Sequence, residues 1–176
     1  MIRIGNDRDA PRSLGRPVAT IGTFDGVHRG HQRVLADLRN WAAELGAKSL
    51  VVTFDRNPRT LTRRRKVPCI TSLEHRLVLF ERLEVDACAV LSFDNRLRRT
   101  SAREFVAGYL CRRLRVQGLL LGFNCRFGHH GEGDYALLKR LAAQGICLAR
   151  RSARPATVGG RRISSSMIRE AIEAGE

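Results

Sequence analysis

Two histidines, His28 and His31, lie three residues apart in the segment GTFDGVHRGH at residues 22–31. An apolar run precedes this segment and a helical pattern begins near its end, so both histidines are expected where a strand gives way to a helix. Backbone amides at a helix start bind phosphate, and imidazoles can donate hydrogen bonds to charge developing on phosphoryl oxygens. The spacing favours phosphoryl or nucleotidyl transfer, although two histidines near a turn could also be surface residues. The glycines that would let the backbone approach a ligand are Gly22, Gly26 and Gly30.

A second candidate phosphate site lies near the end of the chain. The segment ISSSMIRE places Ser164, Ser165 and Ser166 at the expected start of a helix and Arg169 in its first turns. By itself this pattern is also that of a well-capped helix. Taken with the histidine segment, it predicts a single polyphosphate site built from both ends of the chain.

The rest of the chain alternates between short apolar runs and amphipathic patterns. Strands are predicted at residues 16–23, 49–54, 87–93, 116–122 and 146–149, and helices at residues 30–45, 71–83, 101–114, 137–144 and 167–174. Thr71 or Ser72 with Glu74, and Ser101 with Glu104, are typical of capped helix starts. The alternation predicts an α/β protein with a doubly wound parallel sheet, whose ligands lie at the carboxyl ends of the strands. The polar segment 55–68 is a predicted loop at such an end.

The length of 176 residues fits one core. We set residues 1–16 apart as an N-terminal extension and assign residues 17–176 to the domain. No apolar stretch approaches the roughly 20 residues that span a bilayer, and the first residues lack the apolar core of a signal peptide, so we expect a cytoplasmic protein with no membrane partner. The cysteines are odd in number and widely spaced, which favours small buried apolar residues over disulfides or a zinc site: Cys69, Cys88, Cys111, Cys125 and Cys147.

The formal net charge is +15, and all but three of the 32 basic residues are arginine. Such a charge attracts anions, either a nucleic acid backbone or a small polyphosphate such as ATP. A genome whose base composition favours arginine codons would give the same bias. The arginines are scattered, without the interleaved aromatic residues of a single-strand binder, and the only compact basic run is residues 63–66. Nucleic acid is therefore the less favoured partner.

Several segments, in their order along the chain, together resemble one known family. They are GTFDGVHRGHQ, VVTFDxNP, ITSLEHRLxLFE, SFDxxL, SAREFV, LGFNCRFGHHGEGD and ISSSMIREAIEAG. They resemble the adenylyltransferase (FAD synthetase) half of bacterial bifunctional riboflavin kinase/FMN adenylyltransferases, over about residues 17–175. The resemblance implies a Rossmann-like fold of the HxGH nucleotidyltransferase type and the synthesis of FAD and pyrophosphate from FMN and ATP.

The resemblance also implies a role for individual residues. His28 and His31 would stabilise the transition state, together with Arg169 as a further donor. The residues implied beside ATP are Gly22, Phe24, Asp25, Gly30, Ser164, Ser165 and Ser166. Those implied beside the flavin are Phe54, Asn57, Pro58, Asn124 and Phe127. We expect magnesium to arrive bound to ATP, with Asp25 and Asp134 as outer-shell partners, and no metal held by the protein itself.

This chain departs from the family pattern at the flavin side. Arg56 stands where the first proline of the flavin loop is expected, and Cys125 stands for the first phenylalanine of the later turn. Gly131 occupies a position that is often basic, which His129 or His130 could replace. Relatives continue into a riboflavin kinase barrel, so we expect no kinase activity here. The sequence leaves open a single-function protein, with a separate riboflavin kinase as the pathway partner, and an excised domain.

The implied reaction is an in-line attack of the FMN phosphate on the α-phosphorus of ATP, without a covalent enzyme intermediate or a general base. Three alternatives remain open from the sequence. The chain could use another phosphate acceptor, such as pantetheine phosphate or nicotinamide mononucleotide. It could be a non-catalytic flavin nucleotide sensor, or a nucleic acid binder that uses the positive charge.

Overall fold

The computed structural model describes residues 1–5, 9–58, 60, 67–152 and 157–175, and it is built around one six-stranded parallel sheet. The strand order is β1-β4-β3-β2-β5-β6. The bounds are β1 (Ile2–Ile4), β2 (Val18–Ile21), β3 (Ser49–Phe54), β4 (Ala87–Leu91), β5 (Gly118–Leu121) and β6 (Leu148–Arg151). All pairings within this sheet are parallel, which confirms the predicted doubly wound α/β architecture.

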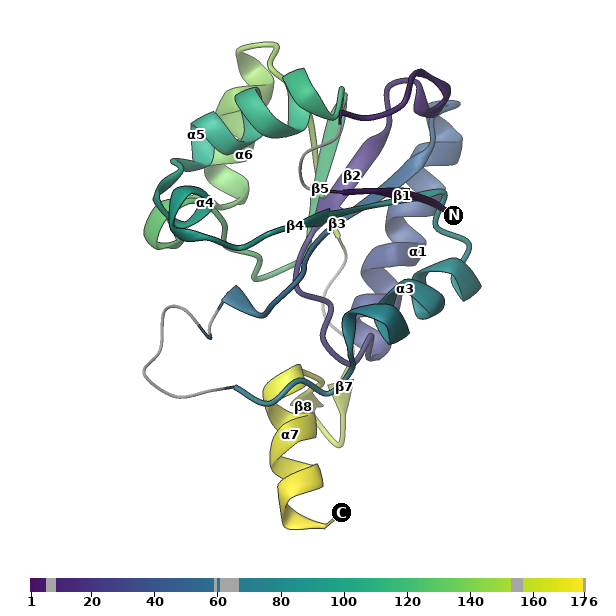
Figure 1. Ribbon diagram of the computed structural model, residues 1–176, viewed down its shortest axis with the longest axis vertical. Helices are drawn as coiled ribbons and strands as arrows, with labels where there is room; N and C mark the ends of the chain where they lie inside the picture. The colour runs from purple at the N-terminus through teal and green to yellow at the C-terminus, as the bar shows by residue number, and fades with distance from the viewer. Residues whose placement is uncertain (6–8, 59, 61–66, 153–156, 176) are drawn as a thin grey trace.

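Helices cover both faces of the sheet (Figure 1). One face carries α1 (Arg29–Glu44) and α3 (Leu73–Arg82). The other carries α5 (Ala102–Glu104), the π-helix η2 (Phe105–Arg113) and α6 (Tyr135–Ala143). The remaining elements are the 3₁₀ turns η1 (Arg12–Leu14) and η3 (His129–Gly131), α4 (Asn95–Arg99), the hairpin β7 (Thr157–Val158) and β8 (Arg161–Arg162), and α7 (Ser165–Ala174). None of these described helices is long and apolar enough to cross a membrane.

The central strands bury both of their faces, as an apolar run in a parallel sheet predicts. In β3, Leu50 and Val52 pack into the cluster under η2 and α6, whereas Val51 packs into the cluster under α1 and α3. The cysteines are all free: Cys88 and Cys147 are buried in these clusters, Cys111 and Cys125 are half-buried, and Cys69 is exposed.

The structure differs from the sequence expectations in several elements, of which three concern the sheet, a helix on one face, and a hairpin. The helix expected at residues 101–114 is one α-helical turn followed by the π-helix η2, although Ser101 caps it as predicted by accepting from the Glu104 N–H. The strand β1, within the segment set apart as an extension, is the sheet edge beside β4. The hairpin β7–β8 was not expected. Elements of two or three residues are too short to show a periodicity, so sequence patterns miss them.

The order of the strands reverses direction at β2. This strand has β3 on one side and β5 on the other, with Val18 in register with both Ser49 and Gly118. The chain leaves β2 toward α1 on one face and leaves β5 toward α6 on the opposite face, which is the arrangement of a topological switch point. The helix α7 and the hairpin β7–β8 lie beyond this end of the sheet (Figure 1). Much of the predicted loop after β3, including the basic run at residues 63–66, falls outside the described residues.

Candidate active site

The two histidines lie at the start of α1, directly after β2. His28 is the N-cap of the helix, and its Nδ1 accepts a hydrogen bond from the His31 N–H at 3.3 Å. The imidazole rings are stacked, with 3.6 Å between centroids and 15° between planes. A Cβ on Gly30 would lie 3.1 Å from the His28 ring, so glycine lets the ring fold closely over the first turn of the helix. The cap and the stack hold both imidazoles at the start of α1, beyond the end of β2.

Burial disfavours the charged form of both imidazoles. The pKa of His31 is lowered to about 3, first by burial and then by the neighbouring His28, while the Asp25 charge opposes the shift. Burial likewise lowers the pKa of His28. His31 Nδ1 is buried and has no hydrogen-bond partner among the described residues. Neutral imidazoles still carry one N–H each, so the pair can donate to an anionic ligand without itself being charged.

Phe24 packs against His31 from the core of the protein. It is buried at 3 % exposure and has a left-handed backbone with φ of 50°. Its ring meets the His31 ring edge-on at 5.2 Å and the Phe80 ring at 5.6 Å. A Cβ on Gly22 would lie 3.1 Å from the Phe24 ring. The structure therefore places Phe24 in the core beneath the histidines, while Gly22 gives the strained turn its room.

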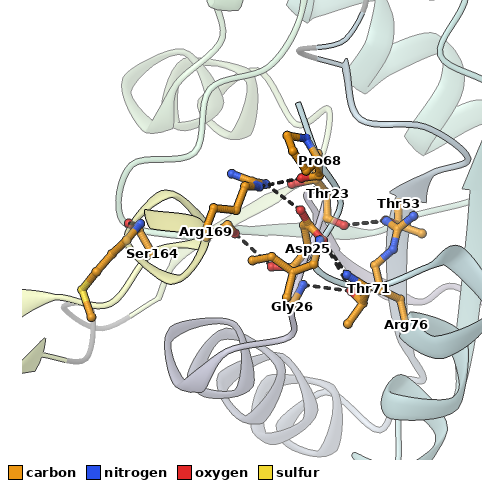
Figure 2. A network of polar contacts seen from close by, with 12 residues as sticks. Thr23, Asp25, Gly26, Thr53, Pro68, Thr71, Arg76, Ser164 and Arg169 are labelled. Atoms are coloured by element: carbon orange, nitrogen blue, oxygen red, sulfur yellow. Dashed lines mark hydrogen bonds and ion pairs between the residues drawn. The ribbon is translucent and has the colours of Figure 1, made fainter. Parts of the chain in front are cut away.

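Asp25 connects the turn to two distant segments (Figure 2). Its Oδ1 accepts from the N–H groups of Ile70 and Thr71 at 2.9 and 3.0 Å. Its Oδ2 forms an ion pair with Arg169 Nη2 at 2.6 Å, and Arg169 Nε donates to the Pro68 carbonyl at 2.7 Å. Asp25, predicted beside ATP, and Arg169, predicted as a catalytic donor, thus contact each other. Among the described residues, Arg169 Nη1 is the guanidinium nitrogen without a hydrogen bond of this kind.

The serines at the start of α7 lie beside the same turn. Ser164 caps the helix by accepting from the Met167 N–H at 3.2 Å, and Ser165 Oγ donates to the Asp25 carbonyl at 2.9 Å. Ser166 is exposed. The Ile163 carbonyl oxygen lies 3.8 Å from where a Cβ on Gly30 would be, so the starts of α1 and α7 are adjacent. The two segments that the sequence predicted to form one polyphosphate site are brought together.

Sequence reasoning missed one charged residue here, Arg76. It is 5 % exposed, and its Nη1 donates to the Thr23 carbonyl at 2.6 Å and to Thr53 Oγ1 at 3.0 Å. Its Nη2 donates to the Phe54 carbonyl at 3.0 Å (Figure 2). The available signal was its spacing from Leu77 and Phe80, which puts an arginine on the apolar face of α3.

The residues predicted beside the flavin follow two different strands. Phe54 ends β3 and packs edge-on against Phe93 at 5.5 Å, and Asn57 and Pro58 follow it, with Asn57 buried. Asn124 follows β5; it is exposed and its amide faces Arg162.

Two residues of the turn after β5 face the interior of the protein. Phe127 is buried in the core, with its ring 6.3 Å from that of Phe105. Cys125 Sγ donates to the Ile21 carbonyl at 3.6 Å, and burial raises the pKa of this thiol to about 11. The exposed aromatic ring of this turn is instead Phe123, which the sequence reasoning did not select, and the Arg151 guanidinium lies over it at 4.4 Å.

A cavity of about 280 Å³ opens at the carboxyl ends of β3 and β4. It is adjacent to Phe54, whose ring contacts Phe93 in the cavity wall. Arg56 belongs to the lining together with Asp55, Ser92, Phe93, Asp94 and Asn95. Its guanidinium therefore adds a cation to this wall.

The other acidic and histidine candidates lie apart from the stacked pair. Asp134 caps α6 by accepting from the Leu137 N–H and pairs with Arg126 at 3.2 Å. His129 and His130 belong to η3, and Gly131 ends this turn with a positive φ. Among the described residues, no three His, Cys, Asp or Glu side chains are grouped as a metal site would need.

The parallel sheet, with a paired-histidine helix start at its switch point, defines a Rossmann-like, doubly wound α/β protein. The chain belongs to the FAD synthetase family, whose sequence model matches residues 10–167.

Curated relatives carry the name bifunctional riboflavin kinase/FMN adenylyltransferase. The protein of Pseudomonas fluorescens is 39% identical over 160 residues, covering 90% of this chain and 51% of that protein. The protein of Escherichia coli K12 is 34% identical over 157 residues, covering 88% and 50%. A putative member from Geobacillus thermodenitrificans is 37% identical over 172 residues, covering 93% and 87%. The chain thus spans about half the length of the first two relatives.

Two solved structures share the fold. A protein from Streptococcus pneumoniae described as a macrolide-efflux protein superposes with a TM-score of 0.81 at 23% identity, over 98% of this chain and 58% of that one. Pantothenate synthetase from Thermus thermophilus gives a TM-score of 0.57 at 15% identity, over 96% and 67%. At these identities the likeness concerns the fold alone.

Proposed function

We propose that this chain is an FMN adenylyltransferase, which transfers the adenylyl group of ATP to FMN and releases FAD and pyrophosphate. The observation that carries the proposal is the stacked neutral pair His28 and His31 at the switch point, adjacent to the start of α7. Membership of the FAD synthetase family supports it. The names of the relatives supply FMN as the acceptor.

In the proposed reaction, a phosphate oxygen of FMN forms a bond to the α-phosphorus of ATP, and the bond from that phosphorus to the bridging oxygen of pyrophosphate breaks. The attacking phosphate is already ionised, so no proton has to be removed from it. The protein therefore needs to align the two phosphates and to place donors where negative charge grows.

His28 and His31 are the proposed catalytic donors, through imidazole N–H groups that burial keeps neutral. The free amides at the start of α1, near Gly30, and the crowded turn at Gly22 bring backbone close to the triphosphate. From α7, the Ser164–Ser166 segment and Arg169 Nη1 complete the phosphate contacts. Asp25 acts through Arg169, because its carboxylate oxygens are engaged by Arg169 and by the amides of Ile70 and Thr71.

Magnesium enters the proposal as part of the substrate, bound to ATP. Mg²⁺ keeps several waters and takes its remaining ligands from phosphates, so the protein need not supply a ligand cage. On the flavin side, we propose that Phe54, Asn57, Pro58 and Asn124 contact the acceptor. Phe127 supports them from the core.

The test incubates the purified chain with ATP, Mg²⁺ and either FMN or riboflavin, and separates the flavins by chromatography. We expect FAD from FMN and no product from riboflavin, with His28→Ala and His31→Ala each lowering turnover by about 100-fold. His75→Ala is the matched control, since that histidine is exposed on α3, and its turnover should stay unchanged. If wild-type protein makes no FAD but adenylylates pantetheine phosphate or nicotinamide mononucleotide, that compound, and not FMN, is the acceptor. Protein that binds flavin nucleotides without turnover would be a sensor.

A further inference from the structure

The buried guanidinium of Arg76 bridges two segments to which the proposed function gives different substrates. Thr23, whose carbonyl accepts from Nη1, belongs to the turn between β2 and α1, where ATP is proposed to bind. Phe54, whose carbonyl accepts from Nη2, begins the segment proposed to contact the flavin. Arg76 itself comes from α3 and belongs to neither segment (Figure 2).

The bridge lies where the sheet no longer fixes the distance between the two strands. Their ladder pairs Ile21 with Val52 and ends with the Gly22 N–H donating to the Val52 carbonyl at 3.1 Å. Beyond that point, the described cross-strand contacts are those of Arg76 and the bond from Thr53 Oγ1 to the Thr23 carbonyl at 3.3 Å. Because a guanidinium is planar and rigid, two of its nitrogens hold their acceptors at a set separation.

Stability alone gives little reason for an arginine at this position. A buried charge is costly, and replacing buried ionic groups by apolar ones is often neutral or stabilising. The partners of Arg76 are two carbonyls and a hydroxyl, the nearby Asp25 is already paired with Arg169, and Arg76 Nε is buried with no partner among the described residues.

We propose that Arg76 is a positioning residue, which sets the separation between the turn at Thr23 and the segment at Phe54 and thereby aligns the FMN phosphate with the α-phosphorus of ATP. This inference rests on the proposed function. Near-attack alignment accounts for large rate factors, and misplacement by about 1 Å can cost on the order of 100-fold in rate. The loss of Arg76 should therefore affect the rate of the bound complex more than the affinity for either substrate.

The experiment measures kcat and KM for ATP and FMN, together with the melting temperature, in the full chain. Arg76→Met is expected to lower kcat by about 50-fold while each KM changes less than about three-fold. Arg76→Lys should recover part of kcat, because an ammonium can donate to either carbonyl but does not hold both in one plane. Arg115→Met is the matched control: Arg115 Nη2 donates to the carbonyls of Ala10 and Pro11, away from the site, so kcat should stay within about two-fold.

Arg76→Met protein that is less stable, yet keeps wild-type kcat per folded molecule, would overturn the inference, as would a change confined to KM. If Arg76→Met does not fold, Thr53→Val decides, since it removes the hydroxyl that joins Arg76 and Thr23 without changing the size of the side chain. It should lower kcat about five-fold, and an unchanged kcat overturns the inference. Wild-type protein that makes no FAD is a separate outcome, which refutes the proposed function before any variant is compared.

Discussion

Asp25 and Arg169 form a buried ion pair at 2.6 Å although 144 positions separate them in the chain. Their side chains are 5 % and 13 % exposed. Asp25 belongs to the turn after the central strand and Arg169 to the last helix, so this contact holds α7 against the turn that carries His28 and His31. It also joins both to Pro68, through Arg169 Nε.

Removing the arginine from this pair should destabilise the fold. Arg169→Met leaves the buried Asp25 carboxylate without its counter-charge, and we expect the free energy of unfolding in urea to fall by about 3 kcal/mol. Arg39→Met is the control, because Arg39 pairs with Glu84 at an exposed site, with side chains 40% and 73% exposed. That variant should lose less than about 1 kcal/mol. Equal losses in the two variants would contradict the structural role given to the buried pair.

Stability should depend on pH through His31. Its pKa is lowered to about 3 in the folded protein, whereas an unfolded histidine titrates near 6.5. The unfolded chain therefore binds the proton first, and the contribution is fully present above about pH 6.5 and is lost as the pH falls toward 3. The slope from this one group is at most about 1.4 kcal/mol per pH unit.

The measurement compares the free energy of unfolding in urea of wild type and His31→Gln between about pH 7.5 and about pH 5, a range that includes the pKa of an unfolded histidine. The wild-type curve should fall more steeply than that of the variant below about pH 6.5. Parallel curves would mean that the His31 imidazole accepts a proton in the folded state as readily as in the unfolded one.

Gly30→Ala should separate stability from activity. Alanine is the better helix former by about 1 kcal/mol, which favours a helix position such as this one. Its methyl group, however, would lie 3.1 Å from the His28 ring, so we expect the ring to shift by a few tenths of an ångström against His31. We expect an unchanged or higher melting temperature and a turnover lowered by about ten-fold. Gly108→Ala in η2 is the control, because its Cβ would meet the flexible end of Arg112; similar losses of turnover in both would refute the role of the glycine.

The cavity beside Phe54 predicts a selective effect on the acceptor. Phe93→Leu keeps an apolar side chain but removes the ring that lines the cavity and contacts Phe54. We expect the KM for FMN to rise about five-fold with the KM for ATP unchanged, because an aromatic wall is worth on the order of 1 kcal/mol against a ring. Steady-state kinetics with each substrate varied in turn measures this. A rise in the KM for ATP alone would place the acceptor elsewhere.

Most of the fold could be predicted from the sequence because the relevant signals are local. Short apolar runs indicated the strands β2, β3, β4 and β5. The serines at the helix starts, Ser101 and Ser164, could be recognised from a few adjacent residues. The π-helix η2 was not, because a shift to i→i+5 hydrogen bonds leaves little trace in side-chain pattern. The edge strand β1 needed the partner β4 to define it.

The site divides in the same way. The positions of His28, His31 and the serines followed from their place between strand and helix, and the sequence by itself predicted that the starts of these two helices would lie together, as they do. The tertiary structure decided what each charged group contacts: Asp25 with Arg169, and Arg76 with two carbonyls from different strands. It also decided that Phe127 lies in the core. Local propensities act over a few residues, whereas the partner of a buried charge is set by which distant segments the packed sheet brings within hydrogen-bond reach.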